Sequence, residues 1–258
     1  MDTDLPPPDY VTRADGVRLA YRYRPGRGPT ILFLPGYMSD MTGGKAAALD
    51  AWAAAQGRAM LRLDYSGCGA SSGAFEAGTL DVWRDDVLAV IDAVAGDDSV
   101  GPVGPIVPIG SSMGGWLMLL VALARPAQVA GLIGIAAAPD FTEWGYSDAE
   151  KHRLAEEGRI SVPSIYGGAP YVTTAGFWRS GAANLLLEGT VPIRCPVRLL
   201  HGRADADVPF DISLRLAAAV ESSDVDLLLI KDGDHRLSRP ADIAKLIDVT
   251  HRLLESLP

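Results

Sequence analysis

The chain has 258 residues, 48% of them hydrophobic, so it can bury a large core and suits one α/β domain with an insertion, or at most two domains. Its formal net charge of -9 argues against nucleic acid and anionic membrane surfaces as main partners. Two cysteines, Cys68 and Cys195, are too few for a disulfide framework, which indicates a reducing compartment and predicts two buried, small apolar residues.

The start of the chain, residues 1–8, is acidic and rich in proline. It has neither the basic start and apolar core of a signal peptide nor the arginine and serine bias of a transit peptide. The longest apolar runs, near residues 116–124 and 132–138, are too short to span a bilayer. These features predict a chain without a membrane span and with a cytoplasmic location.

Strand and helix patterns alternate along most of the chain. The opening predicts a hairpin, with strands at 10–13 and 17–23 around the turn pair Asp15-Gly16. Further strands are predicted at 30–34, 58–63, 105–109, 132–136, 197–200 and 225–230. Helices are predicted at 46–55, 80–94, 116–124, 212–220 and 243–254. This alternation predicts a mostly parallel sheet with helices on both faces, and the hairpin adds an antiparallel edge.

One segment, residues 141–190, lacks this rhythm and is far longer than an ordinary loop. It holds seven aromatic residues: Phe141, Trp144, Tyr146, Tyr166, Tyr171, Phe177 and Trp178. So many rings must be buried against something. Two interpretations stay open, simple packing onto the main domain or a lid that forms an apolar acyl pocket. We therefore expect a core made of residues 1–140 and 191–258, with a cap or lid at 141–190.

The stretch 110–114, Gly-Ser-Ser-Met-Gly, fits the Gly-x-Ser-x-Gly pattern of a nucleophile elbow between a predicted strand and a predicted helix. The sharp turn of this motif exposes its serine, and the glycines avoid collisions with the neighbouring strand and helix. Only Ser112 has glycine both two residues before and two residues after it. Ordinary turns also carry this pattern, so the partners of Ser112 decide whether it is a nucleophile.

A serine hydroxyl needs a base, and the base needs a third group to orient it. Of the four histidines, His152 lies in the insertion, His251 lies on the closing helix, and His201 directly follows a strand, where its ring more often braces a loop. His235 lies between the last strand and the last helix. Hydrolases with the chain order serine, acid, histidine carry their base at this position, so His235 is the predicted base.

Asp205 and Asp207 are the candidate acids, because their loop follows the strand before that of His235. Residues 201–209 are similar to His-Gly-x-x-Asp-x-x-Val-Pro, the acid loop of the α/β-hydrolase family, in which the aspartate falls on Asp205. The resemblance implies a triad of Ser112, Asp205 and His235 in the chain order of that fold, with Asp207 as the runner-up.

Residues 34–38, Leu-Pro-Gly-Tyr-Met, follow the first parallel strand, where the family places one backbone donor of its oxyanion hole. The resemblance implies the backbone N–H groups of Tyr37 and Met113 as the two donors. Gly36 is expected to let the backbone approach the substrate, and lining the pocket is an alternative role for the Tyr37 side chain. Four further residues are candidates for contact with substrate: Trp144, Tyr146, Phe177 and Trp178.

Several stretches of the main domain carry a narrower resemblance, among them 34–37, 64–67, 110–119, 195–202 and 234–236. Together they are similar to the family of mitochondrial palmitoyl-protein thioesterases that also cleave acyl glucuronides. The insertion agrees more loosely, mainly around residues 162–164 and before Cys195. Specificity for palmitoyl-cysteine is an implication of this resemblance alone. The mitochondrial address is not carried over, because the start of the chain lacks a transit-peptide pattern.

We therefore expect an α/β-hydrolase, a serine hydrolase acting on carboxylic esters or thioesters of small molecules or acylated proteins. No metal and no organic cofactor are implied, and the pattern specifies no oligomeric state. Two alternatives stay open. An aminopeptidase-like amide hydrolase is one, since Gly-x-Ser-x-Gly-Gly also occurs in such serine peptidases. The other is a non-catalytic binding protein on the same fold.

Overall fold

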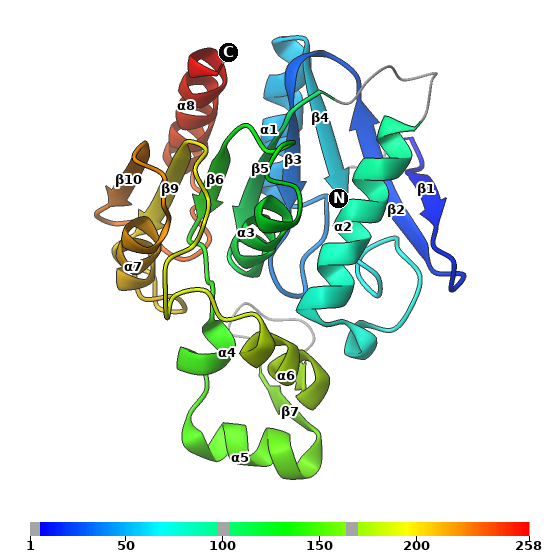
Figure 1. Ribbon diagram of the computed structural model, residues 1–258, viewed down its shortest axis with the longest axis vertical. Helices are drawn as coiled ribbons and strands as arrows, with labels where there is room; N and C mark the ends of the chain where they lie inside the picture. Colours follow the sequence, from blue (N-terminus) through cyan, green and yellow to red (C-terminus); the bar gives the residue numbers. More distant parts are fainter. Residues whose placement is uncertain (1–5, 97–103, 164–169, 258) are drawn as a thin grey trace.

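The computed structural model describes residues 6–96, 104–163 and 170–257, and a central eight-stranded sheet organises it (Figure 1). The strands are β1 (Asp9–Thr12), β2 (Arg18–Arg24), β3 (Arg27–Leu34), β4 (Arg58–Leu63), β5 (Ile106–Ser111), β6 (Leu132–Ile135), β9 (Val197–Gly202) and β10 (Val225–Ile230). Their order is β1-β2-β4-β3-β5-β6-β9-β10. Only the pairings β1–β2 and β2–β4 are antiparallel. The predicted parallel sheet with an antiparallel hairpin edge is confirmed.

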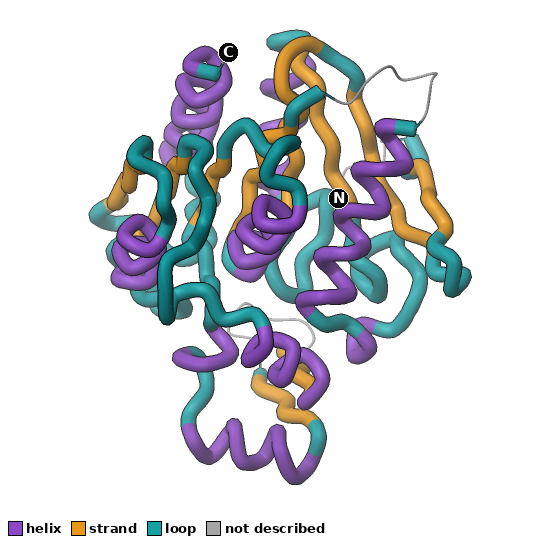
Figure 2. The backbone as a smooth tube through the Cα atoms, viewed as in Figure 1, coloured by secondary structure: helices purple, strands orange, loops and turns teal. Residues whose placement is uncertain are grey.

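Helices cover both faces of this sheet. They are α1 (Gly44–Ala55), α2 (Leu80–Ala95), α3 (Met113–Ala124), α7 (Asp211–Ala219) and α8 (Pro240–Ser256). Figures 1 and 2 show α2, α3 and α7 on one face and α1 and α8 on the other. Successive residues of β3 belong to different cores. Leu32 packs in the cluster that contains Trp83 of α2, whereas Ile31 packs in the one that contains Leu49 of α1. Burial on both faces explains why this strand is continuously apolar.

Two helices begin three residues earlier than the sequence pattern predicts. Helix α3 begins at Met113 because it includes Gly114 and Gly115, which have low intrinsic helix propensity but are held there by tertiary contacts. Helix α8 begins at Pro240, whose ring presets the first helical φ angle. In both cases the helical start is fixed by local backbone chemistry that an apolar periodicity does not register.

Residues 141–190, which we call the inserted segment, fold into elements of their own beyond the carboxyl ends of the strands (Figure 1). The elements are α4 (Phe141–Trp144), α5 (Asp148–Glu157), an antiparallel hairpin of β7 (Arg159–Val162) and β8 (Tyr171–Thr174), and α6 (Ala175–Ala183). They are short, and α5 buries only Leu154, so no clear periodicity marked them. The capping box of Ser147 and Glu150 was the available signal for α5. Ser164 and Tyr166 lie outside the described residues.

A buried carboxylate ties the two ends of the inserted segment together. Asp140, 3% exposed, accepts hydrogen bonds from the backbone N–H groups of Leu186 at 2.9 Å and Leu187 at 2.7 Å. Burial raises the pKa of Asp140, and the two amides oppose that rise. A second connection joins α6 to α2, where the Ser180 hydroxyl donates to Asp81 at 2.6 Å. The segment is therefore fixed to the core by specific polar contacts as well as by packing.

The cysteines are both free. Cys68 is buried and Cys195 is half-buried, and burial raises their thiol pKa values to about 12 and about 11. High thiol pKa values leave little reactive thiolate, which agrees with two packing residues. Across the three described ranges, no helix combines the length and the apolar character needed to cross a bilayer.

Candidate active site

Ser112 lies at the tip of a sharp turn between β5 and α3. Its backbone has φ 55° and ψ -120°, a conformation that is strained for a residue with a side chain. A Cβ atom at Gly110 would lie 2.2 Å from the carbonyl oxygen of Gly114, and one at Gly114 would lie 2.1 Å from that of Leu34. Backbone segments approach so closely here that only glycine fits. The geometry is that of a nucleophile elbow.

Three side chains from three separate loops meet at Ser112. The Nε2 atom of His235 lies 3.1 Å from the Ser112 hydroxyl, and its Nδ1 atom lies 2.8 Å from Oδ2 of Asp205. Ser112 follows β5, Asp205 follows β9 and His235 follows β10. Because these strands are parallel, their carboxyl ends share one edge of the sheet, and the loops converge there.

The Asp205 side chain is fully buried and densely hydrogen-bonded. Its Oδ1 atom accepts from the backbone N–H groups of Asp207 at 2.9 Å and Val208 at 2.8 Å. Burial opposes ionisation, yet the hydrogen bonds from His201, His235 and the Val208 amide lower the pKa of Asp205 below its ordinary 3.8. Asp205 therefore faces the His235 ring as a carboxylate and fixes its orientation.

The remaining histidines have other surroundings. His201 is fully buried and braces the acid loop, with Nδ1 2.6 Å from the Ser213 hydroxyl and Nε2 3.0 Å from the Val208 carbonyl. His152 lies exposed on α5, and the ring of His251 packs near Trp52. Within the described ranges, His235 is thus the histidine that reaches Ser112.

Asp207, the runner-up acid, lies exposed beside the cavity, and its backbone N–H donates to Asp205. One ligand atom each from Asp205, Asp207 and His235 lie within 4.8 Å of one another, which is close enough to consider a metal. However, the two oxygens of Asp205 already accept from two backbone amides, His235 and His201. A metal would have to displace these donors, so we assign none.

The loop after β3 lies directly against the elbow. A Cβ atom at Gly36 would lie 3.3 Å from the Ser111 carbonyl oxygen and 3.4 Å from Cβ of Ser112. The loop closes in a turn, in which the Ser39 N–H donates to the Gly36 carbonyl at 3.1 Å. On the other side of Ser112, Met113 is the first residue of α3, where backbone N–H groups have no partner within the helix. The two predicted oxyanion donors therefore flank Ser112.

A cavity of about 580 Å³ opens beside Ser112 and His235, within the usual range for small-molecule sites. The inserted segment forms an aromatic wall with Phe141, Trp144, Tyr146 and Tyr171. The core contributes Gly36, Tyr37 and Met113 on the floor and two cations, Lys45 and Arg236, on the opposite side. Lys45 donates to the Arg236 carbonyl at 2.5 Å, and burial together with the Arg236 charge lowers its pKa to about 8.

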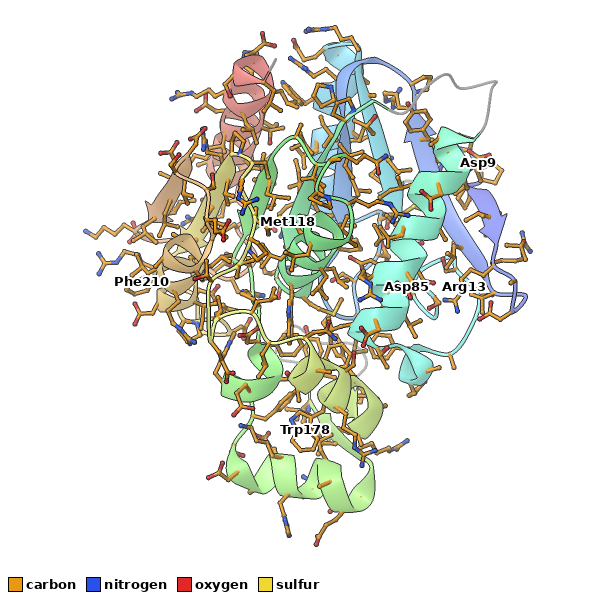
Figure 3. The ribbon with its side chains drawn as sticks, viewed as in Figure 1. Asp9, Arg13, Asp85, Met118, Trp178 and Phe210 are labelled. Atoms are coloured by element: carbon orange, nitrogen blue, oxygen red, sulfur yellow. The ribbon has the colours of Figure 1, made fainter. Side chains whose placement is uncertain are left out.

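Two predicted pocket residues have another place in the structure. Phe177 is 1% exposed, and its ring centroid lies 5.0 Å from that of Tyr37 and 5.5 Å from that of Trp83, so it packs beneath the inserted segment. Trp178 lies within that segment, well away from the sheet and outside the cavity lining (Figure 3). Trp144 and Tyr146 do line the cavity. Aromatic content alone could not separate packing from pocket residues.

Three further lining residues were not predicted, namely Lys45, Tyr171 and Arg236. Arg236 directly follows His235, so its proximity to the base was a usable signal. Lys45 follows two glycines in the loop after the first parallel strand, a position that also faces the carboxyl edge. For Tyr171 the sequence held no signal, because its place depends on how β8 pairs with β7.

Comparisons with known proteins agree with this fold and site. The family described as serine aminopeptidase, S33, matches residues 28–157. The human mitochondrial palmitoyl-protein thioesterase ABHD10 is 40% identical over 252 residues, which cover 96% of this chain and 80% of that protein. The structure of mouse α/β-hydrolase domain-containing protein 10 has a TM-score of 0.87 with 38% identity, covering 96% of this chain and 98% of that one. A hydrolase from Agrobacterium vitis reaches 0.88 with 38% identity over 96% and 98%.

The comparisons contradict the predicted cytoplasmic location. The human and mouse curated relatives are both named as mitochondrial proteins. The prediction used the acidic start of the chain and its cysteine content, and a low cysteine content reports on redox conditions rather than on a particular compartment. The cytoplasmic location is therefore wrong.

Identity at this level over nearly the whole chain, and the same fold at the same coverage, do not depend on one motif. They extend through the inserted segment, where the sequence resemblance was weakest. Catalytic elbow, sheet order and relatives all lead to one assignment. The chain belongs to the α/β-hydrolases, in the family of the mitochondrial palmitoyl-protein thioesterases, and is a hydrolase of esters or thioesters.

Proposed function

We propose that Ser112, His235 and Asp205 form a catalytic triad that hydrolyses acyl esters and thioesters through an acyl-enzyme. The observation that carries the proposal is one continuous hydrogen-bond chain, 3.1 Å from serine to histidine and 2.8 Å from histidine to aspartate. A strained, glycine-flanked serine at a strand-to-helix turn supports the same assignment.

In the acylation step, His235 Nε2 takes the proton of the Ser112 hydroxyl as the oxygen attacks the acyl carbonyl. The buried Asp205 carboxylate keeps Nδ1 of His235 protonated and stabilises the imidazolium that forms. The tetrahedral intermediate collapses, the bond to the leaving group breaks, and the imidazolium supplies a proton to an alkoxide leaving group. Ser112 then carries the acyl group as an ester.

Deacylation uses the same groups in reverse roles. His235 removes a proton from water, the resulting hydroxide attacks the acyl-serine ester, and Ser112 leaves as its oxygen recovers the proton. In both steps the negative charge on the tetrahedral oxygen is stabilised by the backbone N–H groups of Tyr37 and Met113. Such a donor is worth about 3–4 kcal/mol of transition-state stabilisation.

Residues 141–190 act as a substrate-binding lid in this proposal, with residues 1–140 and 191–258 as the catalytic core. Its aromatic wall lies on one side of the cavity, which suits an apolar acyl chain. The curated relatives are named palmitoyl-protein thioesterases. We accordingly propose long-chain acyl thioesters, of acylated proteins or small molecules, as the substrates of this chain.

The nucleophile is tested by covalent labelling with a fluorophosphonate probe. Ser112→Ala should abolish both labelling and turnover of p-nitrophenyl esters, a loss on the order of 10⁴-fold or more. Ser111→Ala is the matched control, because it removes the neighbouring hydroxyl and keeps Ser112. Labelling that persists in folded Ser112→Ala protein would refute the assignment.

The substrate class is tested with a chain-length series of acyl esters and acyl thioesters, with one acyl glucuronide included. Rising kcat/KM with acyl length is the expected result. The matching family is described as serine aminopeptidase, so aminoacyl p-nitroanilides belong in the same assay. Faster turnover of these anilides than of the esters would favour amide hydrolysis instead.

A further inference from the structure

The side chain of Tyr37 connects the catalytic core to the inserted segment. Its hydroxyl donates a hydrogen bond to the Val172 carbonyl of β8 at 2.6 Å, although the two residues are 135 positions apart in the chain. Its ring centroid lies 5.1 Å from that of Phe75 in the core and 5.0 Å from that of Phe177 in the inserted segment. Tyr37 is therefore held at its aromatic body by packing and at its tip by one hydrogen bond.

The strand that receives this hydrogen bond is also a wall of the cavity. Tyr171 and Thr173 of β8 line the cavity, and the carbonyl of Val172 between them accepts from Tyr37. An acyl chain in the cavity would thus touch β8 on the residues that flank this carbonyl. The hydroxyl of Tyr37 links the substrate-facing strand to the loop that carries its own backbone.

That loop has little else to fix the backbone of Tyr37. Gly36 precedes it, and Met38 follows it with φ 54°, an uncommon conformation for a residue with a side chain. The carbonyl of Pro35 is held by the Tyr65 hydroxyl at 3.0 Å, which anchors one end of the loop. The contact of the Tyr37 hydroxyl with β8 supplies an anchor on the other side of Gly36.

We propose that the Tyr37 hydroxyl is a positioning group for the oxyanion hole, holding the backbone N–H of the same residue against Ser112 through its hydrogen bond to Val172 of β8. The inserted segment then sets the geometry of the chemical step as well as the shape of the pocket. The inference rests on the proposed function, because it assigns the oxyanion donor to Tyr37.

The test is Tyr37→Phe, which keeps the packed ring and removes only the donor. A donor displaced from the oxyanion lowers the rate without weakening ground-state binding. For p-nitrophenyl acetate, kcat should fall on the order of 10- to 100-fold while KM stays within about 2-fold. The inhibition constant of a trifluoromethyl ketone, which forms a tetrahedral oxyanion on the serine, should rise by a similar factor.

A matched pair of side chains covers the case in which Tyr37→Phe does not fold. At position 37, p-aminophenylalanine keeps a donor at the ring tip and should restore kcat, whereas p-methylphenylalanine of similar size should not. Ser180→Ala removes another hydrogen bond between the inserted segment and the core, remote from the loop, and should leave kcat for p-nitrophenyl acetate unchanged.

Three results would overturn the inference. They are an unchanged kcat in folded Tyr37→Phe protein, a change confined to KM, or an equal loss of kcat in Ser180→Ala. Fluorophosphonate labelling of the unsubstituted protein separates this failure from failure of the proposed function. If Ser112 is labelled and Tyr37→Phe behaves normally, only the positioning role of Tyr37 is wrong.

Discussion

The carboxyl edge of the sheet and the inserted segment are built by different kinds of interaction. At the edge, backbone segments approach so closely that Cβ atoms at Gly110 or Gly114 would lie within 2.2 Å of carbonyl oxygens. In the inserted segment, helix α5 buries only Leu154, and attachment depends on aromatic rings and a few polar contacts such as that of Asp140. One region is fixed by main-chain packing and the other by side chains.

This difference indicates how the two regions divide the work. Catalysis needs reacting atoms placed within a fraction of an ångström, which close-packed backbone provides. Substrate choice needs a surface whose shape can vary, which side chains on short helices and a hairpin provide. Substitutions at the edge should therefore destroy activity towards every substrate, whereas substitutions in the inserted segment should redistribute it among substrates.

The largest effect is expected from Gly114→Ala. The new Cβ atom would lie 2.1 Å from the Leu34 carbonyl oxygen and 2.5 Å from that of Pro35, both main-chain atoms that cannot move independently. We expect a loss of about 3 kcal/mol or more in the free energy of unfolding and a fall in kcat of at least about 100-fold. Chemical denaturation and p-nitrophenyl acetate turnover measure the two losses.

Gly176→Ala in α6 is the matched control from the inserted segment. Its new Cβ atom would lie 3.6 Å from the nearest atom, the hydroxyl oxygen of Thr174, which is an ordinary contact. Since alanine favours the helix, the free energy of unfolding should change by less than about 1 kcal/mol, in the stabilising direction. Similar losses in Gly114→Ala and Gly176→Ala would remove the distinction between the two regions.

The same distinction explains what the sequence could predict. Glycines around Ser112 and the positions of Asp205 and His235 after successive strands are local patterns, and the parallel sheet brings those three loops together. The elbow geometry could therefore be anticipated from spacing. The core strands could be anticipated too, because burial on both sheet faces makes them continuously apolar.

In the inserted segment the sequence was less informative. Phe177 and Trp144 have similar apolar character, yet one packs beneath the segment and the other lines the cavity. Which side a ring faces depends on the orientation of short helices, and that is set by tertiary contacts. The contact between Tyr37 and Val172 had no signal at all, because its acceptor is a main-chain carbonyl.

A smaller effect, confined to long substrates, is expected from Trp144→Ala. Trp144 lies on the aromatic wall, so its loss removes apolar contact with a bound acyl chain. KM for p-nitrophenyl octanoate should rise about 10-fold, or about 1–2 kcal/mol of binding, while kcat and KM for p-nitrophenyl acetate stay within about 2-fold. An equal loss with both esters would show that the inserted segment also supports the catalytic geometry at this point.

The smallest effect concerns acid stability and the buried carboxylate of the catalytic edge. Because folding lowers the pKa of Asp205 below 3.8, its stabilising contribution is complete above that value and is lost as the pH falls towards the lower folded pKa. The stability difference between the unsubstituted protein and Asp205→Asn should therefore be constant from pH 7 to pH 5. Below 3.8 it should shrink by about 1 kcal/mol per pH unit.

Denaturant unfolding at pH 5 and pH 3 measures this difference. Asp248→Asn is the control, because Asp248 forms an exposed ion pair with Arg252, and exposed pairs contribute about 0–1 kcal/mol. Its stability difference should change little over the same range. If Asp205→Asn behaved like Asp248→Asn, the hydrogen bonds from His201, His235 and the Val208 amide would not be holding Asp205 ionised, and the edge would owe its rigidity to backbone packing alone.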